Sequence, residues 1–232
     1  MMQIGSKKWK NIIYDGAKHL EIQMDWGKID QFAIHALELS KWTRKINLTA
    51  ISDPLDMAVK HFLDSIAPVP MIPKDVSLLD MGSGGGFPGI PLKVMMPSLS
   101  VTLIDASRKK VSFLNHVIRI LGLNNIEAIH VRAEDLFRDG NFNPAYDIII
   151  SRALSSMVNF VQMSLPLLSK DGSIIAMKGK ISAKKIESEL SLVSKRPENK
   201  ENSTSNFNVI LKKYRLPYLK SERSLVILKS IH

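Results

Sequence analysis

The chain has 232 residues, 45% of them hydrophobic and 23% charged, which is typical of a globular protein with a sizeable core. It contains no cysteine, which excludes disulfides, thiolate zinc sites and cysteine nucleophiles. Its formal net charge of +10 favours a polyanionic partner, nucleic acid first. The first residues lack the apolar core of a signal peptide, and no apolar run approaches the ~20 residues of a membrane span. We therefore expect a cytoplasmic protein with no membrane contact.

Residues 1–70 are predicted to form an N-terminal helical extension. In "DQFAIHALELSKWTRKI" apolar side chains recur at roughly helical spacing, at Phe32, Leu37 or Ala36, Leu39 and Ile46. The three prolines of "APVPMIPKD" end this helical region. The remaining residues, 71–232, are expected to form a single second domain.

From Val76 onwards the sequence alternates between strands and helices. The predicted strands are "VSLLDM", "SVTLIDAS", "IEAIHVRAED", "YDIIISRA" and "SIIAMKG". The helix "RKKVSFLNHVIRILGL" is amphipathic and has Gly122 as its C-cap, and "SMVNFVQMSLPLLSKDG" is predicted as a helix closed by a Lys-Asp-Gly turn. This alternation predicts a mostly parallel sheet covered by helices on both faces.

The C-terminal part departs from this alternation. Residues Ser194–Asn206 are polar, lack large apolar side chains and predict a loop. After them, "FNVILKKYRLP" and "SLVILKSI" have no helix between them, so they predict an antiparallel hairpin at the sheet edge.

The stretch "LLDMGSGGGFPGIP" places a glycine-rich turn between the first strand and its helix. Such a turn lets a ligand approach the main chain and face the helix N-terminus. Read from Gly84, the turn matches the dinucleotide pattern G-x-G-x-x-G, with Asp105 lying 21 positions further on. The strand ends at Asp80 or Met81, however, so the turn begins at Gly82, and in that register Phe87 replaces the last required glycine.

The register that fits the strand is D-x-G-x-G-x-G over residues 80–86, which is the first motif of class I S-adenosylmethionine-dependent methyltransferases. In this interpretation, Gly82 and Gly84 leave room for the methionine and ribose of the cofactor. Asp105, at the end of the second strand, accepts hydrogen bonds from the ribose hydroxyls.

Five segments, "NLTAI…HFLDS", "DMGSGGGFPGIPL", "LIDASRKKVSFL", "VRAED" and "DIIISRA…MKG", together resemble the bacterial small-subunit ribosomal RNA guanine-N7 methyltransferases, the RsmG (GidB) family. The resemblance implies a Rossmann-like α/β class I methyltransferase domain over residues 71–232. It implies methyl transfer from S-adenosyl-L-methionine to N7 of a guanine in 16S rRNA. The implied partner is 16S rRNA or a small-subunit precursor, the implied cofactor contacts are Gly82, Phe87, Ala133, Glu134 and Arg152, and we expect a monomer without a metal.

The residues offer a physical rationale for each of these contacts. Phe87 would form an apolar wall, and Ala133 and Glu134 follow the third strand, where adenine lies in this class. Arg152 lies at the carboxyl end of the fourth strand, where such sheets bind ligands, and would grip either the cofactor or an RNA phosphate. An isolated Glu134 would instead be a solvated helix-start carboxylate.

Three further features keep two interpretations each, and a fourth is set aside. His61 is either a packed core histidine or a side chain facing the active site. Lys178 either meets an RNA phosphate or is solvated. The tryptophans either stack on bases or pack in the core. The tetrapeptide "NPAY", residues 143–146, resembles a signature of enzymes that methylate exocyclic amines, but it precedes its strand and is predicted to be a turn.

No catalytic residue is assigned, because guanine N7 carries a free lone pair and needs only proximity, orientation and desolvation. Two alternatives stay open from the sequence. The chain could be a non-catalytic RNA-binding protein that keeps the cofactor pocket, or an NAD-dependent oxidoreductase.

Overall fold

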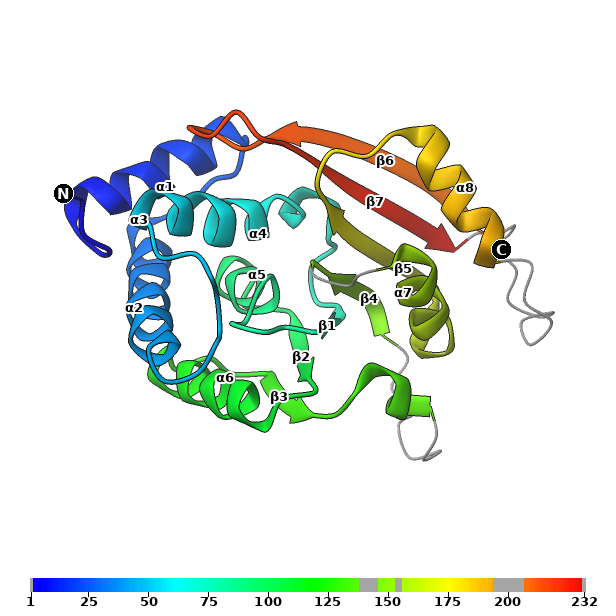
Figure 1. Cartoon of the computed structure of the whole chain (residues 1–232), viewed down its shortest axis with the longest axis horizontal. Helices are drawn as coiled ribbons and strands as arrows, with labels where there is room; N and C mark the ends of the chain where they lie inside the picture. The colour runs from blue at the N-terminus through cyan, green and yellow to red at the C-terminus, as the bar shows by residue number, and fades with distance from the viewer. Residues whose placement is uncertain (1, 138–145, 153–155, 194–206, 231–232) are drawn as a thin grey trace.

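The computed structural model describes residues 2–137, 146–152, 156–193 and 207–230. The described residues form a sheet in the order β3-β2-β1-β4-β5-β7-β6 (Figure 1). Its strands are β1 (Ser77–Met81), β2 (Ser100–Asp105), β3 (Ile126–His130), β4 (Tyr146–Ser151), β5 (Leu168–Lys178), β6 (Phe207–Arg215) and β7 (Glu222–Ser230). The first five strands pair in parallel, whereas β7 runs antiparallel to both β5 and β6. The predicted sheet and its edge hairpin are confirmed.

The N-terminal part is helical, as predicted. It contains α1 (Lys7–His19) and α2 (Trp26–Thr43), followed by a continuous helical run of α3 (Pro54–Asp56), the π-helix η1 (Met57–Leu63) and α4 (Asp64–Ile66), then a 3-10 turn η2 (Val69–Met71). The side chains of Ser6 and Asp25 cap α1 and α2 by accepting hydrogen bonds from backbone N–H groups of the first turn. In α2, Ala36 is fully buried and Leu37 is half exposed, so Ala36 is the residue on the apolar face.

The helices that follow the strands are α5 (Gly89–Met95), α6 (Arg108–Ile120), α7 (Met157–Ser164) and α8 (Ala183–Val193), with 3-10 helices η3 (Ala133–Phe137) and η4 (Leu165–Leu167). The end of α6 is the predicted glycine cap. Gly122 has a φ of +61°, its N–H donates to the carbonyl of Arg119, and the N–H of Leu123 donates to the carbonyl of Ile118.

The predicted Lys-Asp-Gly turn is wrong. The helix α7 ends at Ser164, before Pro166, which has no N–H to donate inside a helix. Strand β5 already begins at Leu168, and Lys170–Gly172 lie within it. Tyr146 of β4 pairs with Leu168 while Ile148 pairs with Ser173, so the intervening residues form an irregularity in the ladder instead of a turn before it.

Two predictions fall on residues that the structure does not describe. The predicted loop Ser194–Asn206 is one of them. The other is the tetrapeptide at residues 143–146, of which only Tyr146, the first residue of β4, is described.

The two faces of the sheet have separate hydrophobic clusters. One contains Leu78 and Leu103 together with side chains from α1, α2, η1, α5 and α6. The other contains Leu79 and Ile104 together with side chains from α7 and α8, which lie at the right in Figure 1, across the sheet from α2 and α6. The N-terminal helices thus share a core with the sheet, and the division at residue 70 stays a prediction.

The tryptophans differ in their surroundings. Trp9 is fully buried in the first cluster, and its indole N–H donates to the carbonyl of Pro54 at 2.9 Å. Trp26 is 49% exposed and stacks on Tyr14. Trp42 is partly buried against Phe113. Among the described helices, none combines the length and the hydropathy needed to cross a bilayer.

Candidate active site

The candidate site lies at the carboxyl ends of β1, β2 and β4. The strand order reverses at β1, because β2 pairs with it on one side and β4 pairs with it on the other. At such a point the connections diverge and leave a crevice for a ligand. The glycine turn follows β1 here, and Arg152 follows β4.

The glycines of the turn fall into two groups. Gly82 and Gly84 have φ values of +75° and +57°, which disfavour other residues. A Cβ added at Gly82 would meet nothing within 4 Å, and one at Gly84 would meet only the carbonyl oxygen of Gly82, at 3.9 Å. The missing side chains of these two glycines therefore face open space in which a ligand can approach the backbone.

The other glycines leave room for the protein itself. A Cβ at Gly85 would lie 2.9 Å from Cδ1 of Leu39 in α2, and one at Gly86 would lie 2.5 Å from Cδ1 of Ile90. At Gly89 it would overlap the side chain of Leu103. These three positions allow α2, α5 and the sheet to pack closely around the turn, so the high glycine content has two separate causes.

Asp80 and Asp105 hold the turn by accepting hydrogen bonds from its backbone N–H groups. Asp80 is fully buried, and its Oδ2 accepts the N–H of Gly89 at 2.9 Å. Within the described part of the chain its Oδ1 has no hydrogen-bond partner, and burial raises the pKa of this carboxyl to about 7. Asp105 is 8% exposed and accepts the N–H of Gly84 at 3.0 Å and that of Ser107 at 2.8 Å.

Each carboxylate oxygen can accept more than one hydrogen bond, so Asp105 keeps capacity for ribose hydroxyls. Ala133 and Glu134 open η3, a few residues beyond the end of β3, where His130 pairs with Asp105. Ala133 is half-buried and Glu134 is exposed. The structure therefore brings four predicted positions, Gly82, Gly84, Ala133 and Glu134, to the same edge of the sheet as Asp105.

Phe87 occupies a stack of three rings. Its ring lies between the imidazoles of His35 and His61, with centroid distances of 4.8 and 4.5 Å and interplanar angles of 11° and 7°. Phe87 is only 4% exposed. Since histidines cover both faces of the ring, only its edge or its backbone is left for a cofactor, and the predicted contact stays a prediction.

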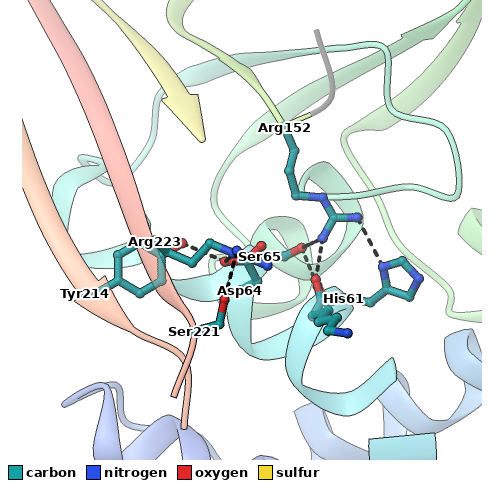
Figure 2. Close-up of polar contacts among 8 residues, drawn as sticks. His61, Asp64, Ser65, Arg152, Tyr214, Ser221 and Arg223 are labelled. Carbon is teal, nitrogen blue, oxygen red and sulfur yellow. Dashed lines mark hydrogen bonds and ion pairs between the residues drawn. The ribbon is translucent and has the colours of Figure 1, made fainter. Parts of the chain in front are cut away.

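Arg152 is held by the helical run that contains His61 (Figure 2). Its guanidinium donates to the carbonyl of Lys60 at 2.8 Å and to Oγ of Ser65 at 3.4 Å, and it lies 5.1 Å from the centroid of Phe87. Its Nη2 also lies 3.2 Å from Nδ1 of His61. Because arginine only donates, this Nδ1 must accept and is unprotonated.

His61 is therefore a neutral acceptor that orients Arg152. Its Nε2–H donates to Oγ1 of Thr49 at 2.8 Å. Burial and the neighbouring charge of Arg152 lower the pKa of His61 to about 3. His61 is predicted from the sequence to be either a packed core histidine or a side chain that faces the active site. Its ring is buried, as in the first interpretation, and it contacts the predicted site residue Arg152, as in the second.

Sequence reasoning missed three residues of this cluster. Asp64 is 5% exposed, and its Oδ1 accepts the hydroxyl of Tyr214 at 2.7 Å and lies 3.5 Å from Nε of Arg223. Arg223 also donates to Oγ of Ser221 (Figure 2). Burial raises the pKa of Asp64. Tyr214 and Arg223 come from β6 and β7, so no local pattern linked them to Asp64, which stands in the quoted segment "HFLDS".

A cleft of about 390 Å³ opens beside this cluster. It lies at the carboxyl ends of β4 and β5, and the polar side chains that line it are Lys60, His61, Asp64, Arg152, Lys178 and Arg223. Burial lowers the pKa of Lys178, which is half-buried. Arg152 contacts Phe87 on the turn and also lines the cleft, so it joins the two halves of the site.

Comparisons with known proteins agree with this geometry. Residues 28–212 match the family model GidB, described as rRNA small subunit methyltransferase G. The ribosomal RNA small subunit methyltransferase G of Geobacter metallireducens is 45% identical over 73% of this chain and 76% of its own length. That of Geobacter sulfurreducens is 40% identical over 93% of this chain and 94% of its own length. A SAM-dependent methyltransferase from Aquifex aeolicus, 15% identical, superposes with a TM-score of 0.58 over 80% of this chain and 97% of its own.

Proposed function

Since the chain belongs to the rRNA small subunit methyltransferase G family, we propose that it transfers a methyl group from S-adenosylmethionine to N7 of a guanine in 16S rRNA. Family and fold make it an S-adenosylmethionine-dependent methyltransferase. The observation that carries the proposal is the open space at Gly82 and Gly84 beside the Asp105 carboxylate.

The glycine-turn half of the site suits the cofactor. Gly82 and Gly84 admit its methionine and ribose portions to the backbone, and Asp105 accepts hydrogen bonds from uncharged ribose hydroxyls. Ala133 leaves space for an adenine ring, and Glu134 is placed to read its edge. When bound, S-adenosylmethionine supplies an electrophilic methyl group on a sulfonium. Phe87 and Arg152 complete this set of proposed contacts.

The cleft half suits the acceptor base. Guanine N7 loses no proton on methylation, so the protein need only orient and desolvate the ring. The histidine of the cleft fits that requirement. The Nδ1 lone pair of His61 already accepts from Arg152, and the pKa of His61 is about 3, so His61 does not act as a base. Arg152, a proposed cofactor contact, also lines the cleft, and Lys178 adds positive charge there for the nucleotide and its phosphates. The basic net charge supports 16S rRNA, or a precursor of the small subunit, as the partner. We propose that the protein acts on this partner as a cytoplasmic monomer.

The chemical identity of the product tests the proposal. N7-methylation places positive charge on the purine, which makes the nucleoside liable to reduction and depurination, after which aniline breaks the chain. Small-subunit rRNA methylated by the protein should break at one site that is absent without the enzyme. Methyl incorporation without that break would refute the N7 assignment. RNA binding with no turnover of the cofactor would instead identify a non-catalytic RNA-binding protein.

The pH dependence of single-turnover methyl transfer gives an independent test. Because no proton leaves N7, the rate should be nearly constant across the pH range in which the protein is folded. A log-linear rise with pH would show that a base is required and would favour an amino or hydroxyl acceptor.

A further inference from the structure

A second, larger cavity of about 650 Å³ lies beside the C-terminal hairpin. It is formed by the residues after β5, the start of α8, the end of β6 and the start of β7. Its charged lining consists of Lys180, Lys185, Lys213, Arg215, Arg223 and Glu222. We call this cavity the hairpin groove.

The hairpin groove has a surplus of positive charge. The carboxylate in its described lining, Glu222, lies 2.7 Å from Nζ of Lys180 and 3.8 Å from Nη2 of Arg215. Arg223 lies 3.5 Å from Asp64. Lys185 and Lys213, by contrast, form no ion pair with any of the described residues. Glu222 is the one carboxylate in this described lining, and its pKa is lowered by Lys180, Arg215 and Lys213 together, so it cannot balance all of the surrounding cations. The remaining positive charge favours an anionic ligand in the groove.

The hairpin groove adjoins the cleft of the active site. Arg223 lines both cavities, and Tyr214 lines the groove while its hydroxyl donates to Asp64 at the cleft. The shared wall gives the backbone of an RNA whose base occupies the cleft a direct route into the groove. Basic grooves that follow a phosphate backbone are the usual means of holding single-stranded nucleic acid.

We propose that the hairpin groove binds backbone phosphates of the RNA next to the target guanine, with Lys185 and Lys213 as its principal phosphate contacts. This inference rests on the proposed function, because it takes the adjoining cleft as the site of the target base. It adds a defined substrate-binding surface, contributed by α8 and by the hairpin, that lies outside the methyl-transfer site.

The chain offers a matched control for each of the two lysines. Lys184 precedes Lys185 on α8, and Lys212 precedes Lys213 on β6; both are exposed, and neither lines the groove. Successive side chains of a strand point to opposite faces, so Lys212 and Lys213 lie on different sides of β6. The groove variant Lys185→Glu/Lys213→Glu and the control variant Lys184→Glu/Lys212→Glu have the same net charge and composition. They differ only in whether the substituted residues line the groove.

The experiment measures the affinity of each variant for naked small-subunit rRNA over a series of salt concentrations. The groove variant should bind at least tenfold more weakly than the control variant. With Lys185→Gln/Lys213→Gln, the slope of log affinity against log salt should fall by about 1.4, since each phosphate that a lysine neutralises accounts for about 0.7 of the slope for single strands. Lys184→Gln/Lys212→Gln should leave the slope near that of the unmodified protein.

S-adenosylmethionine affinity, measured by calorimetry, and the thermal midpoint should be unchanged in all four variants, which shows that they fold. Equal weakening in the groove and control variants would overturn the proposal, because the effect would then be one of overall charge. Weaker binding to the ribosomal particle with unchanged binding to naked RNA would also overturn it, since the groove would then contact protein. Absence of methyl transfer by the unmodified protein would refute the proposed function instead.

Discussion

The two halves of the site are built in different ways. The glycine turn and its braces come mainly from one continuous stretch, residues 80–89, and act through backbone geometry. The Arg152 cluster combines side chains from the η1–α4 run, from the residue after β4 and from the β6–β7 hairpin. The turn depends on the steric and conformational freedom of glycine, whereas the cluster depends on the Asp64–Arg223 ion pair and on the hydrogen bond from Tyr214 to Asp64, which spans 150 positions of sequence.

This difference predicts how each half responds to substitution. In the turn, substitution of a glycine that faces open space should weaken cofactor binding, whereas substitution of a glycine that faces other side chains should lower stability. Changes in the Arg152 cluster should affect the attachment of the hairpin as well as the site itself.

The largest effect is expected for Gly89→Ala. The added methyl overlaps Leu103 and lies 2.8 Å from Oδ2 of Asp80, so it should destabilise the protein by about 3 kcal/mol, the upper part of the range for overpacking. Gly84→Ala, its matched control, should lose only about 1 kcal/mol of stability through its positive φ, but should bind S-adenosylmethionine far more weakly. Urea unfolding and calorimetry measure the two quantities. Equal loss of stability in both variants would contradict the division of the glycines.

Asp64→Asn tests the cluster. Removing this carboxylate leaves Arg223 without its buried ion-pair partner and leaves Arg152 with Asp80 as its remaining carboxylate, so it should lower the free energy of unfolding by about 3 kcal/mol. Tyr214→Phe removes only the hydroxyl and should cost about 1.5 kcal/mol. Both variants should still bind S-adenosylmethionine, while methyl transfer to RNA falls. A cofactor affinity that falls in parallel with stability would mean that the two halves are not separable.

Asp105→Asn should weaken binding of S-adenosylmethionine by about 1.5–3 kcal/mol, the scale of hydrogen bonds to a charged acceptor. The amide keeps one oxygen acceptor, so the N–H of Gly84 or that of Ser107 can still be satisfied. Calorimetric titration with S-adenosylhomocysteine, and with NAD for comparison, measures the loss. Unchanged affinity would show that Asp105 does not contact the ribose.

The smallest effect concerns the pH dependence of stability. Burial lowers the pKa of His35 to about 4 and that of His61 to about 3, so the unfolded chain takes up their protons first and stability is lost as the pH falls below 6.5. Asp80, with its pKa raised to about 7, has the opposite sign, and its contribution is lost as the pH rises from 3.8 to 7. Between pH 6 and 4.5 these three groups together change the proton uptake on unfolding by about one proton, or about 1.4 kcal/mol per pH unit.

His35→Gln removes one of these protons and keeps a donor for the carbonyl of Gly85, which Nε2 of His35 contacts at 2.8 Å. The slope of stability against pH, from urea unfolding at several pH values, should be smaller than that of the unmodified protein by about 1.4 kcal/mol per pH unit in this range. An unchanged slope would show that His35 does not remain neutral in the folded protein.

Much of the fold was predictable, because hydrophobic periodicity and turn residues act locally. The five parallel strands, the glycine cap of α6 and the edge hairpin all follow from such patterns. The prediction failed between α7 and β5, where a Lys-Asp-Gly sequence typical of a turn lies inside the strand. There the pairing with β4, which skips several residues, outweighs the local turn preference.

The sequence by itself determined the glycine turn, its register on β1 and the acid at the end of β2, because steric freedom of the backbone is a property of each residue. Only the tertiary structure decided which glycines face open space and which face Leu39, Ile90 and Leu103. It also decided that His61 accepts from Arg152 and that Asp64 accepts from Tyr214. Such side-chain partnerships depend on distances between remote segments, and these distances exist only once the helices and the hairpin have packed on the sheet.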